Sequence, residues 1–461
     1  MVSLTKKQQY ALDKMREGKN VFLTGKAGTG KSFVVNIFRE EKSKMLVCAP
    51  TGIAALNVDG ATLHRAFKLP VDYVEKSYHI YDNNDVAQVV NKTDCLLIDE
   101  ISMVRADILS HVEYRMRTMS EKSGSAFGGK QIIAVGDFMQ LPPVVMDEEK
   151  DRIRKDYGGS YAFEAKAWKE AGFELIELDE VVRQADLMFV DALNSVREKN
   201  MNASKAVSWI NSNATIGKPV DDCVTLCYTN KAAASINEME LARIAYPPVT
   251  FQASVSGQIK KSDMPVDEVL TLKIGAKVMC CVNNDNYVNG TVGTVTDINS
   301  DFITIDDTID VYKYKWEIKE PVVENGKLSH KVIGEFKQFP LRHAWAITTH
   351  KSQGQTIKGR VHMQMDSKFR PHGSTYVALS RCTDIANLSF ERPLGDKDVF
   401  VDERVRTAMI AMSGGMTTIE VPSFSIELFQ KMIDVMALNP TEQQLNMMMD
   451  RLNSWEVNLC R

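Results

Sequence analysis

A glycine-rich segment near the start of the chain has the residue types and spacing needed to bind a polyphosphate. Residues Gly25–Ser32 fit the pattern G-x-x-x-x-G-K-[ST], between an apolar run that predicts a strand, Val21–Leu23, and one that predicts a helix, Phe33–Phe38. Glycines let backbone N–H groups approach the phosphates, and the helix N-terminus adds its dipole. We expect Lys31 to reach the β- and γ-phosphates and Ser32 to hold Mg²⁺. The strand–loop–helix context favours this over a chance match to a glycine-rich turn. The predicted nucleotide-binding residues of this loop are Gly25, Ala27, Gly28, Thr29, Gly30, Lys31 and Ser32.

Two carboxylates after a second apolar run, Cys95–Ile98, are candidates for metal binding and catalysis. Asp99 is expected to hold Mg²⁺ through water, and Glu100 to orient and deprotonate an attacking water. Alone, this pattern also fits a strand that ends in solvated acids, but its place downstream of a phosphate-binding loop favours catalysis. Gln140 lies in a turn with two prolines and could sense the γ-phosphate; the alternative is a stiffened surface turn.

Two arginines are candidates for neutralising charge in a transition state. They are Arg183, in Leu-Asp-Glu-Val-Val-Arg-Gln, and Arg381, in Val-Ala-Leu-Ser-Arg-Cys-Thr. Such arginines can raise a hydrolysis rate by orders of magnitude. The chain holds 56 lysines and arginines, so any one arginine is more often a solvated surface group, and the pattern alone does not select these two.

Composition limits the classes of protein that fit. The 461 residues are 44% hydrophobic and 25% charged, an ordinary globular mixture long enough for two to four domains. No apolar run is long enough to span a bilayer, and the first residues lack the core of a secretion signal, which leaves cytoplasm, nucleoid or nucleus. The net charge of −4 weighs mildly against a nucleic-acid binder, although a near-neutral body can carry a basic groove. The eight cysteines are scattered and are expected to be free thiols.

Alternation of apolar runs with helical stretches predicts an α/β fold with two parallel sheets. The candidate strands are Val21–Leu23, Met45–Cys48, Cys95–Ile98 and Ile132–Val135 for the first sheet, and Leu175–Leu178, Val224–Tyr228, Ala344–Ile347 and Val361–Met365 for the second. Between about 289 and 339 the pattern changes to period two, and Asn325-Gly326 predicts a hairpin turn, so a small β-barrel inserted there fits best. An aromatic and charged segment, 66–90, is expected to be a shorter insertion.

The ordered motifs resemble those of superfamily 1 helicases of the 5′-to-3′ group, within them the petite-integration-frequency (PIF) family, relatives of the RecD helicases. The resemblance covers about residues 4–390. The motifs that carry it are Leu4–Gln8, the phosphate loop, Ala49–Ala55, Ala61–Phe67, Ile98–Met103, Gly136–Val144, Leu226–Asn230, Ala346–Thr356 and Tyr376–Thr383. Ile98–Met103 and Gly136–Val144 point to the PIF branch in particular.

This resemblance implies two RecA-like domains with ATP between them and single-stranded DNA across both. The expected parts are 1–175 as domain 1 with a wedge-like insert at 66–90, 176–288 and 340–413 as domain 2, 289–339 as the barrel, and 414–461 as a helical tail. It implies that Gln8 reads adenine, that Gly354 also binds the nucleotide, that Arg183 and Arg381 approach the γ-phosphate, and that Gln140 couples hydrolysis to DNA. The residues expected along the DNA are Thr51, Gly52, His64, Pro142, Asn230, Thr349, His350 and Lys351.

Several of these DNA contacts have structural alternatives. Short hydroxyls, histidine and lysine at loop ends can grip phosphates without reading sequence. Without the resemblance, a buried histidine bonded to backbone would be favoured for His64, while Thr349 could be a strand former and Lys351 a solvated charge. The aromatic residues of 66–90 could stack on bases or pack the insert itself.

The predicted function is therefore an ATP- and Mg²⁺-dependent helicase that moves 5′ to 3′ on single-stranded DNA and unwinds forked or structured duplexes. The alternative is a DNA-stimulated ATPase that translocates and remodels protein–DNA complexes without separating strands. A monomer is expected. Residues 414–461 are expected to pack on the core, the favoured reading, or to bind a single-strand-binding or replication protein.

Overall fold

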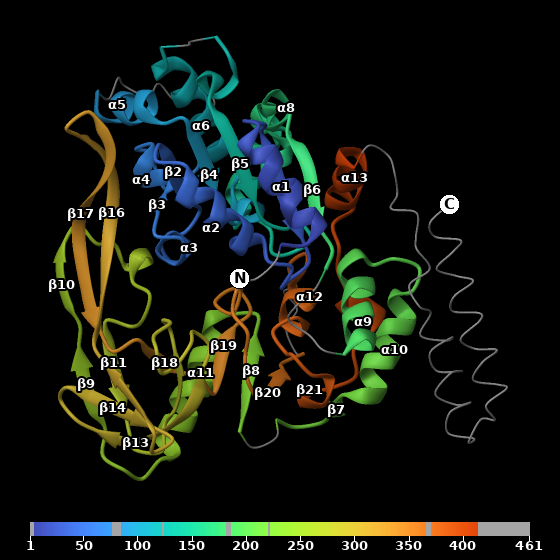
Figure 1. Cartoon of the computed structure of the whole chain (residues 1–461). Helices are drawn as coiled ribbons and strands as arrows, with labels where there is room; N and C mark the ends of the chain where they lie inside the picture. The colour runs from blue at the N-terminus through green and yellow to red at the C-terminus, as the bar shows by residue number, and fades with distance from the viewer. Residues whose placement is uncertain are drawn as a thin grey trace. The chain divides into compact units, whose positions relative to one another are not determined.

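Six parallel strands form the first sheet of the computed structural model, which describes residues 4–75, 84–121, 124–180, 186–219, 222–365 and 370–413 (Figure 1). Its strands, in spatial order, are β3 (Ala61–Thr62), β2 (Met45–Ala49), β4 (Cys95–Ile98), β5 (Gln131–Val135), β1 (Val21–Gly25) and β6 (Glu174–Leu178). The accompanying helices are α1 (Lys6–Arg16), α2 (Lys31–Glu41), α3 (Gly52–Asn57), α4 (Leu63–Ala66), α5 (Asn84–Lys92), α6 (Ala106–Met119), α7 (Asp147–Tyr157) and α8 (Lys166–Ala171). Strands β1, β2, β4 and β5 are buried along their whole length, as expected for a parallel sheet covered on both faces. We call this sheet and its helices the first lobe.

A second parallel sheet of five strands forms the second lobe. Its strands, in spatial order, are β19 (Ala346–Thr348), β8 (Cys223–Cys227), β20 (Arg360–Met363), β21 (Leu388–Phe390) and β7 (Thr215–Ile216). The helices of this part of the chain are α9 (Leu187–Glu198), α10 (Ala203–Asn213), α11 (Asn230–Arg243), α12 (Ser374–Leu379) and α13 (Glu403–Met412). Two parallel sheets with helices between their strands confirm the predicted α/β fold class.

One strand belongs to a different sheet from the one predicted. The sequence placed Leu175–Leu178 at the start of the second sheet, but β6 pairs in parallel with β1, with Val21 opposite Glu174 and Gly25 opposite Leu178. That assignment was wrong because alternation along the chain shows where strands occur and not which sheet accepts them.

Antiparallel strands lie between β8 and β19 in the sequence and start earlier than expected. They are β9 (Val249–Gln252), β10 (Ser254–Gly257), β11 (Val269–Leu272), β12 (Lys277–Cys280), β13 (Val292–Ile298), β14 (Phe302–Ile305), β15 (Ile309–Tyr312), β16 (Tyr314–Glu324), β17 (Lys327–Gln338) and β18 (Leu341–His343). They form a five-stranded sheet, β15-β14-β13-β12-β18, and two smaller ones, β10-β17-β16 and β11-β9. The expected start at 289 missed β9–β12; of these, β9 and β10 are short and largely exposed, so they carry no clear apolar pattern.

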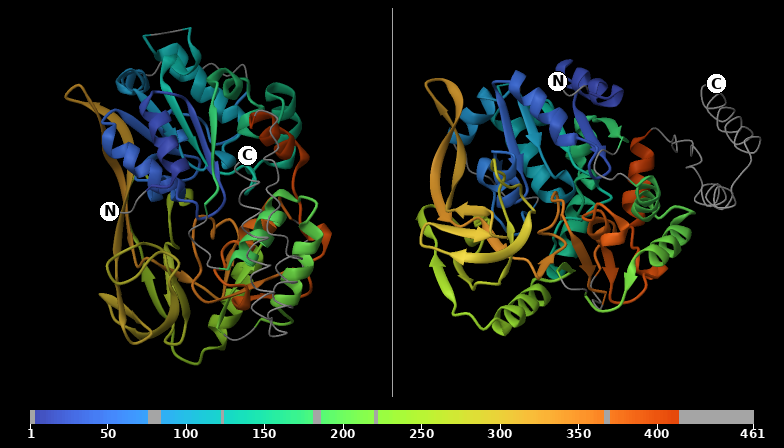
Figure 2. Two further views of the ribbon diagram at one scale, coloured as in Figure 1. Left: turned by 45° about the vertical axis from the view of Figure 1, so that its right-hand side comes forward. Right: turned by 60° about the horizontal axis from the view of Figure 1, so that its bottom comes forward.

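The hairpin of β16 and β17 turns where the sequence predicts it. Asn325 and Gly326 have φ of +51° and +73°, the left-handed pair that a two-residue hairpin turn requires. The hairpin runs along the first lobe and packs against α5 (Figures 1 and 2). Lys319 on β16 forms an ion pair with Asp59 at 2.7 Å, and Glu320 forms one with Lys68. The antiparallel part is therefore held against the first lobe by charged groups.

Three predictions fall wholly or partly outside the described residues. These are the middle of the insertion 66–90, Arg183, and the tail 414–461. Within the ranges that are described, no helix has both the length and the apolar character needed to cross a membrane.

Candidate nucleotide and DNA site

The glycine-rich loop lies between the end of β1 and the start of α2, as its motif predicts. Gly30 precedes α2 with φ of +83°, and a Cβ there would lie 2.6 Å from Nε2 of Gln8, so only glycine fits without a shift. The Lys31 ammonium donates to the carbonyl oxygens of Gly25 at 2.7 Å and Lys26 at 3.0 Å. These two carbonyl oxygens accept the hydrogen bonds that the Lys31 ammonium would otherwise donate to phosphate oxygens. Burial lowers the pKa of Lys31, an effect opposed by the charges of Asp137 and Glu100.

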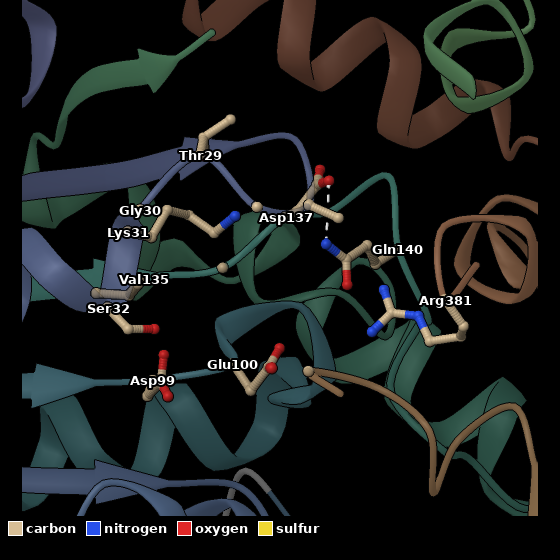
Figure 3. A pocket seen from close by; sticks show the side chains of 14 residues that line it. Thr29, Gly30, Lys31, Ser32, Asp99, Glu100, Val135, Asp137, Gln140 and Arg381 are labelled. Atoms are coloured by element: carbon tan, nitrogen blue, oxygen red, sulfur yellow. Dashed lines mark hydrogen bonds between the residues drawn. The ribbon is translucent and has the colours of Figure 1, made fainter. Parts of the chain in front are cut away.

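A cavity of about 470 Å³ opens beside this loop and takes residues from both lobes (Figure 3). Predicted site residues that line it are Ala27, Gly28, Thr29, Gly30, Lys31, Ser32, Asp99, Glu100, Gln140, Gly354 and Arg381. The first nine belong to the first lobe, while Gly354 and Arg381 belong to the second. A cavity of this volume, lined by a phosphate loop, carboxylates and an arginine, suits a nucleoside triphosphate.

Asp99 and Glu100 follow the last residue of β4 and enter the cavity. Glu100 has φ of +50°, a left-handed conformation uncommon for residues other than glycine and frequent at functional sites. Burial raises the pKa of both carboxyl groups, and the charge of Asp99 raises that of Glu100 further. A raised pKa suits a carboxylate that must accept a proton from water near neutral pH.

The side chains of Ser32 and Asp99 point toward each other on one side of the cavity (Figure 3). A hydroxyl and a carboxylate are hard oxygen donors, and Mg²⁺ in nucleotide sites is held by one or two such groups together with phosphates and water. These two residues therefore fit a magnesium ion. No cluster of three or more His, Cys, Asp or Glu side chains that could hold a metal ion occurs among the described residues.

A buried ion pair connects the cavity to the second lobe. The guanidinium of Arg197, on α9, donates from Nε and Nη2 to the two oxygens of Asp137, at 3.0 and 2.9 Å. Both side chains are buried, and Asp137 also accepts from Nε2 of Gln140 at 3.3 Å. Burial would raise the pKa of Asp137, but the charge and hydrogen bonds of Arg197 outweigh it and hold the pKa below its ordinary value. Gln140 is thus oriented by a carboxylate that depends on Arg197.

Arg381 is buried at 1% exposure, and main-chain and side-chain oxygens fix its guanidinium. It donates to the carbonyls of Val377 at 2.8 Å, Ser352 at 3.1 Å and Gln355 at 2.8 Å, and to the Ser380 hydroxyl. Its guanidinium points toward Glu100 and Gln140 from the opposite side of the cavity (Figure 3). This places a fixed positive charge from the second lobe beside the first lobe's catalytic candidates.

Two predicted nucleotide residues lie behind the loop instead of lining the cavity. Gln8 is buried, its Nε2 donates to the Thr29 carbonyl at 3.1 Å, and its Oε1 accepts from the Thr5 N–H. A Cβ at Gly25 would lie 2.3 Å from the Leu178 carbonyl oxygen, so this glycine permits the close approach of β6 to β1. The adenine-reading role of Gln8 stays a prediction.

Five of the eight predicted DNA residues line two further cavities. Thr51, Gly52 and His64, of the first lobe, line one of about 690 Å³ together with residues of the antiparallel part, among them Gln258 and Ile333. Asn230 and Lys351, of the second lobe, line another of about 440 Å³. Ser262, from the segment between β10 and β11, lines both.

The segment that contains Ser262 is fixed against the first lobe by charge. Asp263 is buried, its carboxylate accepts from Nη2 of Arg65 at 2.8 Å, and its Cα lies within 2.9 Å of where a Cβ on Gly52 would be. Arg65 lines the larger cavity beside His64. The Arg65 guanidinium is therefore paired with the Asp263 carboxylate at a place where the sequence predicts contacts with DNA phosphates.

The other DNA candidates line neither cavity. Thr349 is 1% exposed, and its hydroxyl donates to the Cys227 carbonyl, so its side chain faces the sheet. His350 is half-buried, and burial lowers its pKa, which keeps the ring neutral at neutral pH. Pro142 is half-buried as well. Their contacts with DNA remain predictions.

Sequence reasoning missed several residues that the fold brings to the site. Arg197 sits in an unremarkable helical segment, and Tyr376 accepts a hydrogen bond from the Ala27 N–H at 3.0 Å across the two lobes. Gln353 donates from Nε2 to Glu100 Oε2 at 3.1 Å. Gln353 and Tyr376 fall within quoted motifs, so those motifs were the available signal; no local signal marks Arg197.

Comparison with known proteins shows the family of the chain. Residues 3–212 match the family model of the PIF1-like helicases. The ATP-dependent DNA helicase Pif1 of Campylobacter jejuni is 31% identical over 81% of this chain and 89% of its own length. The crystal structure of a Bacteroides Pif1 with ADP-AlF4 is 30% identical, covers 90% of this chain and 98% of its own, and has a TM-score of 0.83; the same protein bound to single-stranded DNA, with equal coverage, has a TM-score of 0.66. The resemblance predicted from the motifs is confirmed: the chain belongs to the PIF1-like helicase family.

Proposed function

We propose that this protein is an ATP-dependent DNA helicase that moves 5′ to 3′ along single-stranded DNA and unwinds duplex DNA. The observation that carries the proposal is the cavity whose lining joins the phosphate loop and both carboxylates of one lobe to Gly354 and Arg381 of the other. A nucleotide bound there touches both lobes, so its hydrolysis can change how they are held together. Family membership supports the same activity.

The first lobe supplies the groups for hydrolysis. Lys31 exchanges the carbonyls of Gly25 and Lys26 for the β- and γ-phosphate oxygens, since all are hydrogen-bond acceptors. Ser32 and Asp99 hold Mg²⁺, which neutralises phosphate charge when bound. Glu100 orients the attacking water and takes its proton, and its raised pKa keeps that transfer favourable.

The second lobe completes the site and responds to its contents. Arg381 and, by family resemblance, Arg183 approach the γ-phosphate and stabilise the charge of the transition state. ATP, which is bridged between Lys31 and these arginines, favours a closed arrangement, and loss of the γ-phosphate removes that preference. A DNA strand gripped in turn by Thr51, Gly52 and His64 on one lobe and Asn230 and Lys351 on the other advances with each cycle.

Unwinding of two matched partial duplexes tests the proposal. One carries a 5′ single-stranded tail and the other a 3′ tail of equal length and sequence, with ATP and Mg²⁺ present. Unwinding of the 5′-tailed duplex alone is expected. Unwinding of the 3′-tailed duplex alone would overturn the direction, and unwinding by Glu100→Gln would overturn the assignment of the base.

A translocase that remodels protein–DNA complexes is the second candidate, because the same cavity serves both activities. Displacement of streptavidin from biotinylated single-stranded DNA distinguishes them. A protein that displaces streptavidin and hydrolyses ATP on DNA, but separates neither duplex, is a translocase.

A further inference from the structure

Gln353 of the second lobe makes a direct contact with the catalytic candidate of the first. Its Nε2 lies 3.1 Å from Oε2 of Glu100 and 3.5 Å from Oε1 of Gln140. Both neighbours present oxygen acceptors, so the amide nitrogen and not the amide oxygen must face them. We propose that Gln353 is a positioning residue that orients Glu100 for water activation and transmits DNA occupancy to it.

The side-chain amide of Gln353 also carries an oxygen, Oε1, beside the nitrogen that faces Glu100. Its Oε1 is buried and has no hydrogen-bond partner among the described residues. A buried acceptor without a partner is costly, and a water molecule is the smallest group that satisfies it. A water bound to this oxygen would lie close to the carboxylate that Gln353 holds. The side chain thus offers a donor to the base and an acceptor to water at the same place.

The backbone that carries Gln353 is fixed by Arg381. The guanidinium of Arg381 donates to the carbonyls on either side of this residue, at Ser352 and Gln355, with distances of 3.1 and 2.8 Å. Arg381 is 1% exposed, so these bonds are shielded from water. An arginine that lines the nucleotide cavity therefore also sets the position of the Gln353 amide.

The same short loop continues into the DNA candidates. The N–H of Gln353 donates to the His350 carbonyl at 3.2 Å, and that of Ser352 donates to the Thr348 carbonyl at 3.0 Å. His350 and Lys351 are thus joined to Gln353 by a single hydrogen-bonded turn. A shift of this turn when DNA binds to His350 or Lys351 moves the amide relative to Glu100. A displacement of about 1 Å at a catalytic group can change a rate about 100-fold.

This DNA coupling rests on the proposed function, whereas the contact with Glu100 does not. Two variants separate hydrogen bonding from shape. Gln353→Glu keeps the shape but removes the donor and adds a charge that repels Glu100; Gln353→Leu removes both polar atoms. Gln355→Leu is the matched control, because Gln355 lies in the same loop and its Nε2 donates to Asn289 Oδ1, away from Glu100.

The measurements are kcat and KM for ATP with and without single-stranded DNA, together with equilibrium binding of a fluorescent ATP analogue and of labelled DNA. We expect both Gln353 variants to lower the DNA-stimulated kcat about 10- to 100-fold, Gln353→Glu at least as much as Gln353→Leu, with both affinities within about twofold of the wild type. The ratio of DNA-stimulated to DNA-free kcat is expected to fall.

Full activity in Gln353→Glu would show that only shape matters and overturn the proposal. A loss of nucleotide affinity as large as the loss of kcat would assign Gln353 to binding instead. An unchanged stimulation ratio, or an equal loss in Gln355→Leu, would overturn the coupling. Because none of these assays depends on strand separation, failure of strand separation in the wild type would refute the helicase proposal and leave the contact with Glu100 standing.

Discussion

Replacing Arg197 with methionine tests the buried ion pair that joins α9 to the nucleotide cavity. The side chains of Arg197 and Asp137 are 3% and 0% exposed, and two hydrogen bonds of 3.0 and 2.9 Å connect them. Removing the arginine leaves the buried carboxylate without its paired guanidinium, and the Lys31 ammonium is a remaining positive charge that acts on it. Breaking a buried pair in this way costs about 3–5 kcal/mol of folding free energy. Because Asp137 also orients Gln140, turnover is expected to fall with stability.

Equilibrium unfolding in urea gives the loss of stability, and a double variant shows its cause. Arg197→Met is expected to lose about 3–5 kcal/mol. Asp137→Asn in the same chain removes the stranded charge and keeps an acceptor for the Met139 N–H, so the double variant is expected to recover part of this loss. The control is Arg16→Met, whose pair with Glu41 is exposed to solvent and is expected to contribute little to stability.

The dependence of the unfolding free energy on pH tests the same prediction independently. In the wild type, Arg197 holds the pKa of Asp137 below its ordinary value, so the pair stabilises the fold above about pH 4 and the effect is lost in acid. Without the arginine, burial raises that pKa, and the folded state keeps a proton that the unfolded chain releases. The deficit of Arg197→Met is therefore smaller at pH 5 than at pH 8. A deficit below about 1 kcal/mol, or a double variant no more stable than the single one, would refute the reasoning.

Four further outcomes are expected. Lys31→Ala abolishes ATP hydrolysis in a phosphate-release assay, because its ammonium meets the phosphates, whereas Glu100→Gln retains ATP and DNA binding in filter assays while kcat falls about 10²–10⁴-fold. Burial lowers the pKa of His372, whose ring donates to the Phe138 carbonyl. The unfolded chain therefore binds a proton that the folded state does not, and the melting temperature is expected to fall as the pH drops below about 6.5. The fall is expected to be smaller in His372→Gln, which has no titrating ring. Asp263→Asn releases Arg65 and tightens single-stranded DNA binding about three- to tenfold in anisotropy titrations, roughly 0.7–1.4 kcal/mol; weaker binding would show that this carboxylate helps to form the DNA site.

Local sequence patterns predicted the strands, turns and loops whose conformation depends on consecutive residues. The strands of the first sheet are visible as apolar runs because both faces of a parallel sheet are covered, and the β16–β17 turn is visible because Asn325 and Gly326 accept positive φ. The residues of the phosphate loop reach one cavity because six of them are consecutive between β1 and the first turn of α2. Spacing was sufficient wherever neighbours in sequence are neighbours in space.

Contacts between distant segments were beyond such patterns. Asp137 and Arg197 are 60 residues apart, Arg65 and Asp263 are 198 apart, and Glu100 and Gln353 are 253 apart. Each of these pairs forms only because the chain brings separate elements together. No periodicity in α9 distinguishes Arg197 from a surface arginine, since its burial depends on the carboxylate at the end of β5.

Gly25 illustrates why a motif can identify a residue and still mislead about its task. The pattern that begins at Gly25 predicts a phosphate-binding glycine, yet a side chain there would meet the Leu178 carbonyl on β6 at 2.3 Å and not the cavity. Gln8 behaves alike, since its amide supports the loop through the Thr29 carbonyl. Both residues hold the phosphate loop in shape from behind, one by admitting a neighbouring strand and the other by a hydrogen bond. A substitution at either is therefore expected to weaken nucleotide binding through the position of the loop, without any direct contact between that side chain and phosphate.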